Sequence, residues 1–150
     1  MILMAQAVPS ATRLPCLATL PSGWSAALPA MQNGRATLWL DSDRGGRHAV
    51  GVTLTRACTL QGAVRVPSDE VGTTRYEKPL TLRPTLTGYR YYVFPGGCIR
   101  YRYRFTSGAP SSLLFDMDAA LATEPRADVA ARVAVQEDAL LCGVGVHCEG

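Results

Sequence analysis

The sequence predicts a mainly β protein: an antiparallel, sandwich-like fold with one or two short helices near its C-terminal end. Three observations lead to this prediction. Apolar and polar residues alternate in several short runs between residues 35 and 105, turn-forming residues separate these runs, and helical composition is confined to residues beyond 110. Because strands precede helices along the chain, an α+β arrangement is the alternative.

The composition indicates one domain. A chain of 150 residues is long enough to bury roughly 70 % of the surface that its unfolded form exposes. A hydrophobic content of 47 % with 18 % charged residues excludes a wholly disordered chain. We therefore expect a Pro/Ala-rich leader at residues 1–34, followed by a single β-rich globular domain at residues 35–150.

The leader is expected to be extended. Its prolines at positions 9, 15, 21 and 29 exclude a regular helix through it, because proline lacks a backbone donor and fixes φ. Residues 14–24 are expected to pack on the body. Residues 1–8 are apolar but have no basic residue before them, so they are at most the remnant of a secretory signal or of a transmembrane segment.

The sequence pattern of residues 35–86 predicts strands separated by polar segments. The expected strands are residues 35–40, 48–56, 60–66 and 80–86. A turn is expected at residues 41–46 and a long polar loop at residues 71–78. Pro84 confines the last strand to an edge of the sheet. In the second strand, one face carries Val50, Val52 and Leu54, and the other carries Thr53 and Thr55.

A hairpin gives the clearest signal in the chain. Its expected strands, residues 89–94 and 99–105, flank a turn at residues 95–97. In the second strand the apolar side chains Ile99, Tyr101, Tyr103 and Phe105 face one way, and Arg100, Arg102 and Arg104 face the other. Beyond the hairpin, residues 111–121 predict a short helix capped by Ser111 or Ser112, and residues 127–141 predict a second helix.

Five cysteines provide candidates for disulfides. None lies in a C-x-x-C pair, which disfavours a zinc ribbon or a thioredoxin-type centre, and counting alone allows many connectivities. Cys58 follows one expected strand and Cys98 opens another, so a bond between them would clamp neighbouring strands and contribute about 4 kcal/mol. Cys142 and Cys148 enclose a short flexible segment that can close on itself. Buried, reduced thiols are the alternative.

Three segments carry a resemblance to known proteins. They are residues 35–44 (RATLWLDSDR), 66–77 (VPSDEVGTTRYE) and 91–98 (YYVFPGGC). The chain resembles extracytoplasmic domains of actinobacterial membrane-associated proteins over roughly residues 14–118. The resemblance implies a location outside the cytoplasm and a disulfide between Cys58 and Cys98, and it implies no activity.

Motifs for catalysis and metal binding are missing from the sequence. There is no Gly-x-Ser-x-Gly, no phosphate-binding glycine loop and only two histidines, so we predict no catalytic residues, no nucleotide and no cofactor. The Asp41–Asp43 segment predicts a turn rather than an EF-hand, because position twelve of that loop is Val52. Cys142, His147 and Cys148 are too few for a structural zinc site, and we predict no metal.

The hairpin supplies the candidate binding residues. They are Arg90, Tyr91, Arg100, Tyr101, Arg102 and Arg104. Basic side chains beside aromatic rings bind anionic polymers, lipid headgroups or single-stranded nucleic acid. Core tyrosines with solvated arginines are the simpler alternative. The net charge of only +3 and the acidic residues near position 69 make nucleic acid a weak candidate.

These observations together predict a non-enzymatic, extracytoplasmic interaction domain of a membrane-associated or secreted protein. Its expected partners are a cell-envelope polymer, a lipid headgroup or another membrane protein, and no oligomeric state follows from the sequence. A membrane anchor would lie in a segment missing from this chain or truncated in it. The alternative is a cytoplasmic single-stranded nucleic-acid binder that uses the hairpin of residues 89–105.

Overall fold

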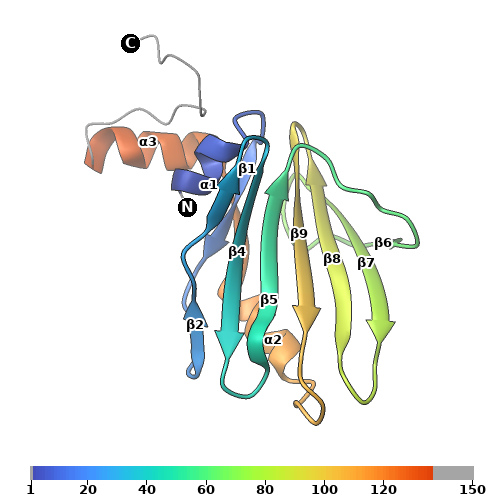
Figure 1. Cartoon of the computed structure of the whole chain (residues 1–150). Coiled ribbons are helices and arrows are strands. Elements are labelled where there is room, and N and C mark those ends of the chain that lie inside the picture. The colour runs from blue at the N-terminus through green and yellow to red at the C-terminus, as the bar shows by residue number, and fades with distance from the viewer. Residues whose placement is uncertain (1, 137–150) are drawn as a thin grey trace.

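The computed structural model describes residues 2–136 and has a mainly antiparallel β fold (Figure 1). The large sheet has eight strands: β2 (Trp24–Ala26), β3 (Ala30–Gln32), β4 (Arg35–Ser42), β5 (Gly46–Thr55), β6 (Val64–Val66), β7 (Thr74–Thr81), β8 (Thr87–Phe94) and β9 (Gly97–Arg104). The other elements are a two-stranded sheet of β1 (Arg13–Leu17) and β10 (Leu121–Pro125), and the helices α1 (Ile2–Ala7), α2 (Leu113–Ala120) and α3 (Arg126–Gln136). The predicted fold class is confirmed.

The large sheet has one covered face and one open face. Its strand order is β2-β4-β5-β9-β8-β7-β6, with β3 also paired to β4. Helix α2 and the β1–β10 pair lie behind this sheet in Figure 1, and β1 contacts both β5 and β9. We call the side under these elements the covered face and the opposite side the open face. The two-layer arrangement buries a single core on the covered face.

The core forms because apolar residues alternate in the central strands. Val52 on β5 pairs in register with Tyr101 on β9, so both side chains lie on the covered face. Both are almost fully buried. On the other side of the core, α2 contributes Leu113 and Met117, each with no exposed surface. The predicted division of β5 and β9 into an apolar and a polar face is therefore present.

The predicted hairpin is β8–β9, and its tip is held by the N-terminal segment. The turn places Gly96 at a φ of +73°, which favours glycine. The hydroxyl of Ser10 donates to the Gly96 carbonyl at 2.7 Å, and that of Thr12 donates to the Pro95 carbonyl at 2.7 Å. A Cβ on Gly96 would lie 1.8 Å from the Ser10 carbonyl oxygen, so this close approach also requires glycine.

The expectation of an extended leader without a helix is wrong at residues 2–7, which form α1. This helix ends before Pro9, so no helical hydrogen bond is lost to proline. Met4 and Val8 are buried at 2 % and 0 % exposure, and they belong to the main core. Further along, Leu14 and Trp24 are buried, as the expected packing of residues 14–24 requires. The segment also supplies β1, β2 and β3.

Two expectations in the middle of the chain are also wrong. Residues 74–81, most of which were expected in a loop, form the strand β7 between β6 and β8. Residues 82–86, assigned by sequence to an edge strand, instead form a connection that contains a cis peptide bond before Pro84. The predicted strand at residues 60–66 shortens to β6 at the sheet edge.

The C-terminal helices lie close to their expected positions. α2 falls within residues 111–121, and Ser112 occupies its N-cap position without a side-chain cap hydrogen bond. α3 begins at Arg126, one residue before the expected start. Its expected continuation to residue 141 lies outside the described residues. None of the helices within residues 2–136 is both long and apolar enough to cross a membrane.

Candidate functional site

The candidate binding residues divide between the two faces of the sheet. Strand register pairs Arg90 with Tyr101 and Tyr91 with Arg100. Directly opposed residues of an antiparallel pair share a face, and neighbours along a strand alternate. Arg90 and Tyr101 therefore lie on the covered face, and the remaining candidates lie on the open face: Tyr91, Arg100, Arg102 and Arg104. The hairpin does not bring all six together.

Arg90 stabilises the covered face and is not available to a ligand. Its side chain is only 8 % exposed and forms ion pairs with Glu77, at 2.8 Å, and with Asp118 on α2. Burial alone would lower the pKa of Arg90, but the hydrogen bond and charge of Asp118, together with the charge of Glu77, raise it. A permanently charged guanidinium thus links the sheet to α2.

Tyr101 is also unsuitable as a ligand contact. It is 2 % exposed, and burial raises the pKa of its hydroxyl well above the ordinary value. No residue in the described part of the chain accepts or donates a hydrogen bond at this hydroxyl. The assignment of Arg90 and Tyr101 as binding residues is therefore corrected, because both point into the molecule.

The acidic residues near position 69 belong to the same covered-face network. Asp69 accepts hydrogen bonds from Arg75, at 2.9 Å, and from the hydroxyl of Tyr92, at 2.8 Å. Burial tends to raise the pKa of Asp69, but these hydrogen bonds outweigh it and the pKa is lowered. Glu70 accepts from Thr123 through both carboxylate oxygens. These carboxylates fix β10 and β7 against neighbouring segments.

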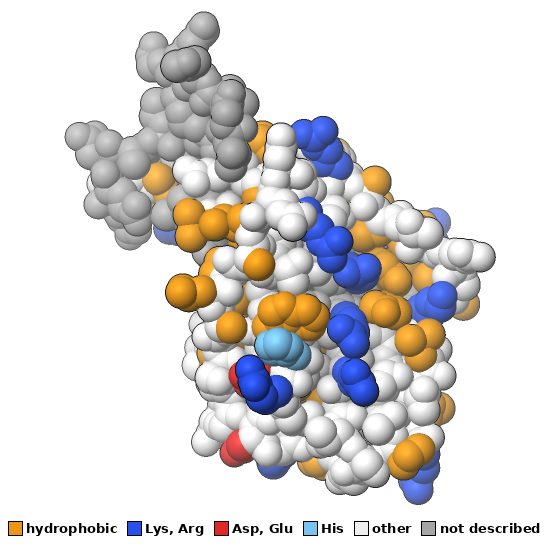
Figure 2. Space-filling view, in the orientation of Figure 1, with side chains coloured by type: hydrophobic (Ala, Val, Ile, Leu, Met, Phe, Trp, Pro, Cys, Tyr) orange, Lys and Arg blue, Asp and Glu red, His pale blue; other side chains and the backbone are white. Residues whose placement is uncertain are grey.

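The open face carries basic and aromatic side chains in two rows across the sheet. Strand register defines a first row of Thr37, Thr53, Arg100, Tyr91, Tyr76 and Arg65. The second row is Trp39, Gly51, Arg102, Tyr89 and Lys78. Figure 2 looks onto this face and shows Lys and Arg side chains following one another along it, with very few acidic side chains.

Aromatic rings hold the open-face arginines in place. The guanidinium of Arg100 lies 5.7 Å from the centre of the Tyr89 ring, and that of Arg102 lies 5.9 Å from the Trp39 ring. These are cation–π distances. Such a ring orients a guanidinium without neutralising its charge or using its N–H donors. Neither arginine forms an ion pair with a carboxylate of residues 2–136.

Trp39 and His48 are open-face residues that sequence reasoning did not select. Their rings stack with centroids 4.8 Å apart, and His48 has a φ of 50°, which is uncommon for a residue other than glycine. A Cβ on Gly51 would lie 2.4 Å from the Trp39 ring, so the ring can lie flat on β5 only above a glycine. The alternation in β4, where Trp39 stands between buried Leu38 and Leu40, is the signal that places it outward.

A small polar pocket lies at one end of the open face, beside a disulfide. It has a volume of about 200 Å³ and is lined by Arg35, Thr53, Thr55, Ala57, Cys58, Thr59, Tyr91 and Arg100. The sulfurs of Cys58 and Cys98 lie 2.07 Å apart, as a disulfide requires, and this pairing agrees with the prediction. The bond attaches the segment after β5 to the start of β9.

The other cysteine predictions are not addressed by the structure. Cys142, His147 and Cys148 lie outside the described residues. Cys16 on β1 is half-buried, and it forms no disulfide with another described cysteine. Burial raises the pKa of its thiol.

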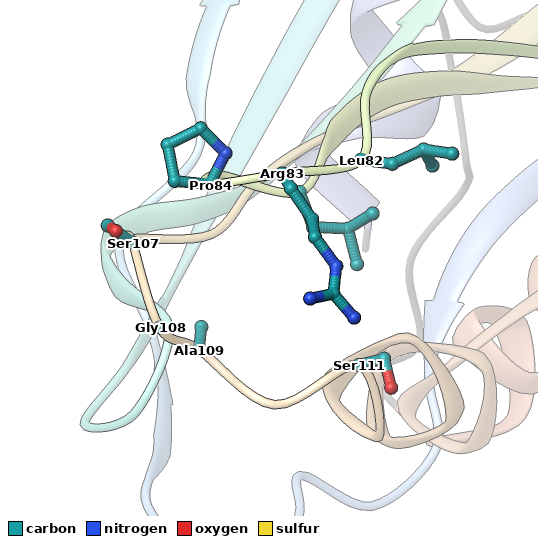
Figure 3. Close-up of a pocket in the computed structure, with 8 residues that line it drawn as sticks. Leu82, Arg83, Pro84, Ser107, Gly108, Ala109 and Ser111 are labelled. Carbon is teal, nitrogen blue, oxygen red and sulfur yellow. The ribbon is translucent and has the colours of Figure 1, made fainter.

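A larger pocket of about 710 Å³ lies at the opposite end of the sheet (Figure 3). The side chain of Arg83 extends into it from the β7–β8 connection, facing the segment that leads to Ser111. Its other walls are formed by Leu82, Pro84, Leu86, Ser107, Gly108 and Ala109. Arg83 is the only side chain of this lining that carries a charge.

Residues 2–136 contain no group of three or more His, Cys, Asp or Glu side chains arranged to hold a metal ion. In the Asp41–Asp43 segment, Asp41 instead accepts a hydrogen bond from the backbone N–H of His48 at 2.6 Å.

Fold and surface together define a mainly antiparallel β domain with one covered face and one open, basic face. Compared with known proteins, the chain matches no family model, no curated protein and no solved structure.

Proposed function

We propose that this chain is a non-enzymatic interaction domain that works outside the cytoplasm and binds an anionic polymer of the cell envelope through its open face. One observation carries the proposal. Six basic side chains lie on the open face, and throughout residues 2–136 none of them has a carboxylate within ion-pair distance. They are Arg35, Arg65, Lys78, Arg100, Arg102 and Arg104.

The arrangement of these charges suits a linear polymer. Arg100, Arg102 and Arg104 follow one another at every second position of β9, so their Cα atoms are spaced by about 7 Å along the strand. Asp41 is an acidic residue at one end of the face, and its carboxylate accepts a hydrogen bond from the backbone N–H of His48. A chain with regularly repeated negative charges can therefore contact several guanidiniums at once, while a predominantly basic surface attracts it from a distance.

The aromatic residues of the open face support a polymer that contains sugar or polyol units. Trp39 lies flat on the sheet, and Trp39 and Tyr89 are both partly exposed, whereas the ring of Tyr91 is buried beside Tyr89 with ring centroids 6.0 Å apart. Flat rings with a polar edge offer both an apolar surface and hydrogen bonds to such units. A surface for small inorganic ions alone would not need the apolar area of these rings.

The location is proposed on separate grounds. Disulfides persist in oxidising compartments and are rare in the cytoplasm, and the Cys58–Cys98 pair lies at bonding distance. The resemblance to extracytoplasmic actinobacterial domains supports the same location. A cytoplasmic nucleic-acid binder would use the same arginines and rings, but it would have to keep this disulfide in a reducing environment.

Direct binding measurements test the proposal. The oxidised protein is titrated with poly(glycerol phosphate), polygalacturonate, neutral dextran, single-stranded oligothymidylate and vesicles of anionic lipid, while the tryptophan fluorescence is recorded, to which Trp24 in the core and Trp39 on the open face both contribute. We expect an anionic envelope polymer to bind at low salt and to lose affinity as salt rises, because binding releases counterions. The proposal fails if neither envelope polymer binds, or if oligothymidylate binds more tightly than both.

A matched pair of variants separates the open face from net charge. The open-face variant carries Arg100→Gln, Arg102→Gln and Arg104→Gln, and the control carries Arg44→Gln, Arg83→Gln and Arg132→Gln, so each loses three positive charges. We expect the first to bind at least about tenfold more weakly than the second. Equal losses would show unspecific attraction to the charged protein and would contradict an assigned binding face.

A further inference from the structure

We propose that the pocket beside the disulfide is a subsite for a single phosphate group, held between the guanidiniums of Arg35 and Arg100. This inference rests on the proposed function and deepens it, because it names the chemical group that the polymer presents. It also assigns a role in ligand binding to the Cys58–Cys98 bond.

The lining of the pocket contains cations and hydroxyl groups but no carboxylate. Arg35 reaches it from β4 and Arg100 from β9, on opposite sides of β5. Neither arginine takes part in an ion pair within the described chain. Two uncompensated guanidiniums beside one cavity repel each other, and an anion between them removes that repulsion.

Arg100 has an unused hydrogen-bond donor. Its Nε atom is buried and has no acceptor among the residues that the structure describes. A buried donor without a partner is costly, and such groups in native proteins require an explanation. The Tyr89 ring orients the guanidinium by a cation–π contact but offers no acceptor in its plane. Arg100 also lines the pocket, so an oxyanion bound there lies beside a guanidinium with an unused donor.

The hydroxyl groups favour a phosphate over a carboxylate. Burial raises the pKa of Tyr91, so its hydroxyl is protonated and available as a donor. The hydroxyl of Thr55 already donates to the Ala57 carbonyl at 2.8 Å, and that of Thr53 lies 3.3 Å from the Thr37 hydroxyl. Among residues 2–136, the remaining side-chain donors of the lining are those of the arginines, Tyr91 and Thr59. Donors that approach from several elements suit the oxygens of a tetrahedral phosphate better than the two coplanar oxygens of a carboxylate.

The disulfide builds one wall of the pocket. Residues 57–59 follow the end of β5 and contribute three of the lining residues. Cys98, which holds this segment through Cys58, lies opposite Thr55 in register and two positions before Arg100 on the same face. Reduction frees the wall while leaving the strands paired. The phosphate subsite is therefore complete only in the oxidised protein.

The experiment uses glycerol 3-phosphate as the probe, with galacturonate and inorganic sulfate as comparison anions. Binding to the full oxidised chain is followed by NMR through the Nε–H resonance of Arg100, which reports directly on a new acceptor. We expect this resonance to shift on titration with glycerol 3-phosphate, and to shift less with galacturonate at equal concentration. A larger effect of galacturonate would overturn the assignment to phosphate.

Variants and reduction then test the two walls. Arg35→Gln is expected to weaken probe binding by at least about tenfold, and Arg56→Gln, an equal charge change just outside the pocket lining, by less than about twofold. Reduction, or Cys58→Ser with Cys98→Ser, should weaken probe binding in a protein whose circular dichroism remains β-rich. Equal effects of Arg35→Gln and Arg56→Gln would overturn the subsite, and so would undiminished binding after reduction.

Failure of the subsite and failure of the proposed function are distinguishable. If poly(glycerol phosphate) binds and the Arg100 resonance does not respond to glycerol 3-phosphate, the pocket is not the phosphate subsite although the open face binds the polymer. If no anionic polymer binds, the proposed function fails, whatever the small probe does.

Discussion

The covered and open faces of the large sheet use the same residue type in opposite ways. Arg90 on β8 and Arg100 on β9 belong to one hairpin, yet Arg90 forms two ion pairs and Arg100 forms none with any described residue. On the covered face a guanidinium leaves water, so it needs carboxylates to compensate for lost hydration. On the open face the partly exposed guanidinium of Arg100 packs against the Tyr89 ring and has no carboxylate partner among the described residues. Covered-face arginines thus stabilise the fold, and open-face arginines are available for binding.

The largest expected effect follows from breaking the covered-face network. Arg90→Met removes the common partner of Glu77 and Asp118, so Asp118 loses its ion pair and Glu77 keeps only Arg75. We expect the free energy of unfolding to fall by about 4 kcal/mol, measured by urea denaturation. Arg100→Met is the matched control on the other face of the same hairpin, with an expected loss below about 1 kcal/mol. Similar losses for the two variants would contradict the division between the faces.

The disulfide lies at the open face, but unlike the open-face arginines it is expected to stabilise the fold. It closes a loop between residues separated by 40 positions. The double variant Cys58→Ser, Cys98→Ser should lose up to about 4 kcal/mol of unfolding free energy, because the unfolded chain regains loop entropy. Urea denaturation of the double variant beside the oxidised wild type measures this. A loss equal to that of Arg100→Met would indicate that the bond contributes nothing to stability.

A substitution at Gly51 is expected to change stability less, but to displace the Trp39 ring from the open face. Gly51→Ala places a methyl group where the Trp39 ring lies, so the ring must leave the sheet and lose its stack with His48. We expect a loss of about 1 kcal/mol, greater quenching of fluorescence by iodide, and weaker polymer binding. Gly108→Ala is a control for quenching and binding only, because its Cβ meets nothing within 4 Å. Unchanged quenching in Gly51→Ala would contradict the position of the ring.

The sequence predicted the faces of β9 but not the role of Arg90, and the difference has a physical cause. In β9, apolar residues alternate strictly with arginines, so burial alone decides which side chains face inward. In β8, Tyr89-Arg90-Tyr91-Tyr92 has no such contrast, and its orientation depends on register with β9 and on Asp118, 28 positions away. Such a long-range partner leaves no local pattern in the sequence.

The same cause explains why β7 was missed. Its covered-face residues include Arg75 and Glu77, which form an ion pair with each other at 2.5 Å and contact Asp69 and Arg90. A strand that faces inward with charged residues lacks the apolar alternation by which strands are recognised.

The pocket at Arg35 and Arg100 was not predicted for a related reason. Its lining comes from β4, β5 and β9, which lie side by side only after the sheet has formed.

The smallest expected effect is a pH dependence that belongs to the covered face. Because the pKa of Asp69 is lowered in the folded protein, its carboxylate contributes stability above its unfolded pKa, near 4, and this contribution is lost as the pH falls through the lower folded value. Asp69→Asn should therefore be less stable than the wild type at neutral pH, and the two stability curves should converge in acid. Urea denaturation at a series of pH values measures both curves.

Two further variants show whether this acid sensitivity is specific to the covered face. Tyr92→Phe removes one of the hydrogen bonds that lower the Asp69 pKa, so it should flatten the acid limb of the stability curve in part. Arg100→Met leaves the covered-face carboxylates untouched, and its curve should run parallel to that of the wild type at low pH. If Asp69→Asn kept the full acid slope, other carboxylates would carry the pH dependence. A flattened limb in Arg100→Met would instead couple the two faces that the structure separates.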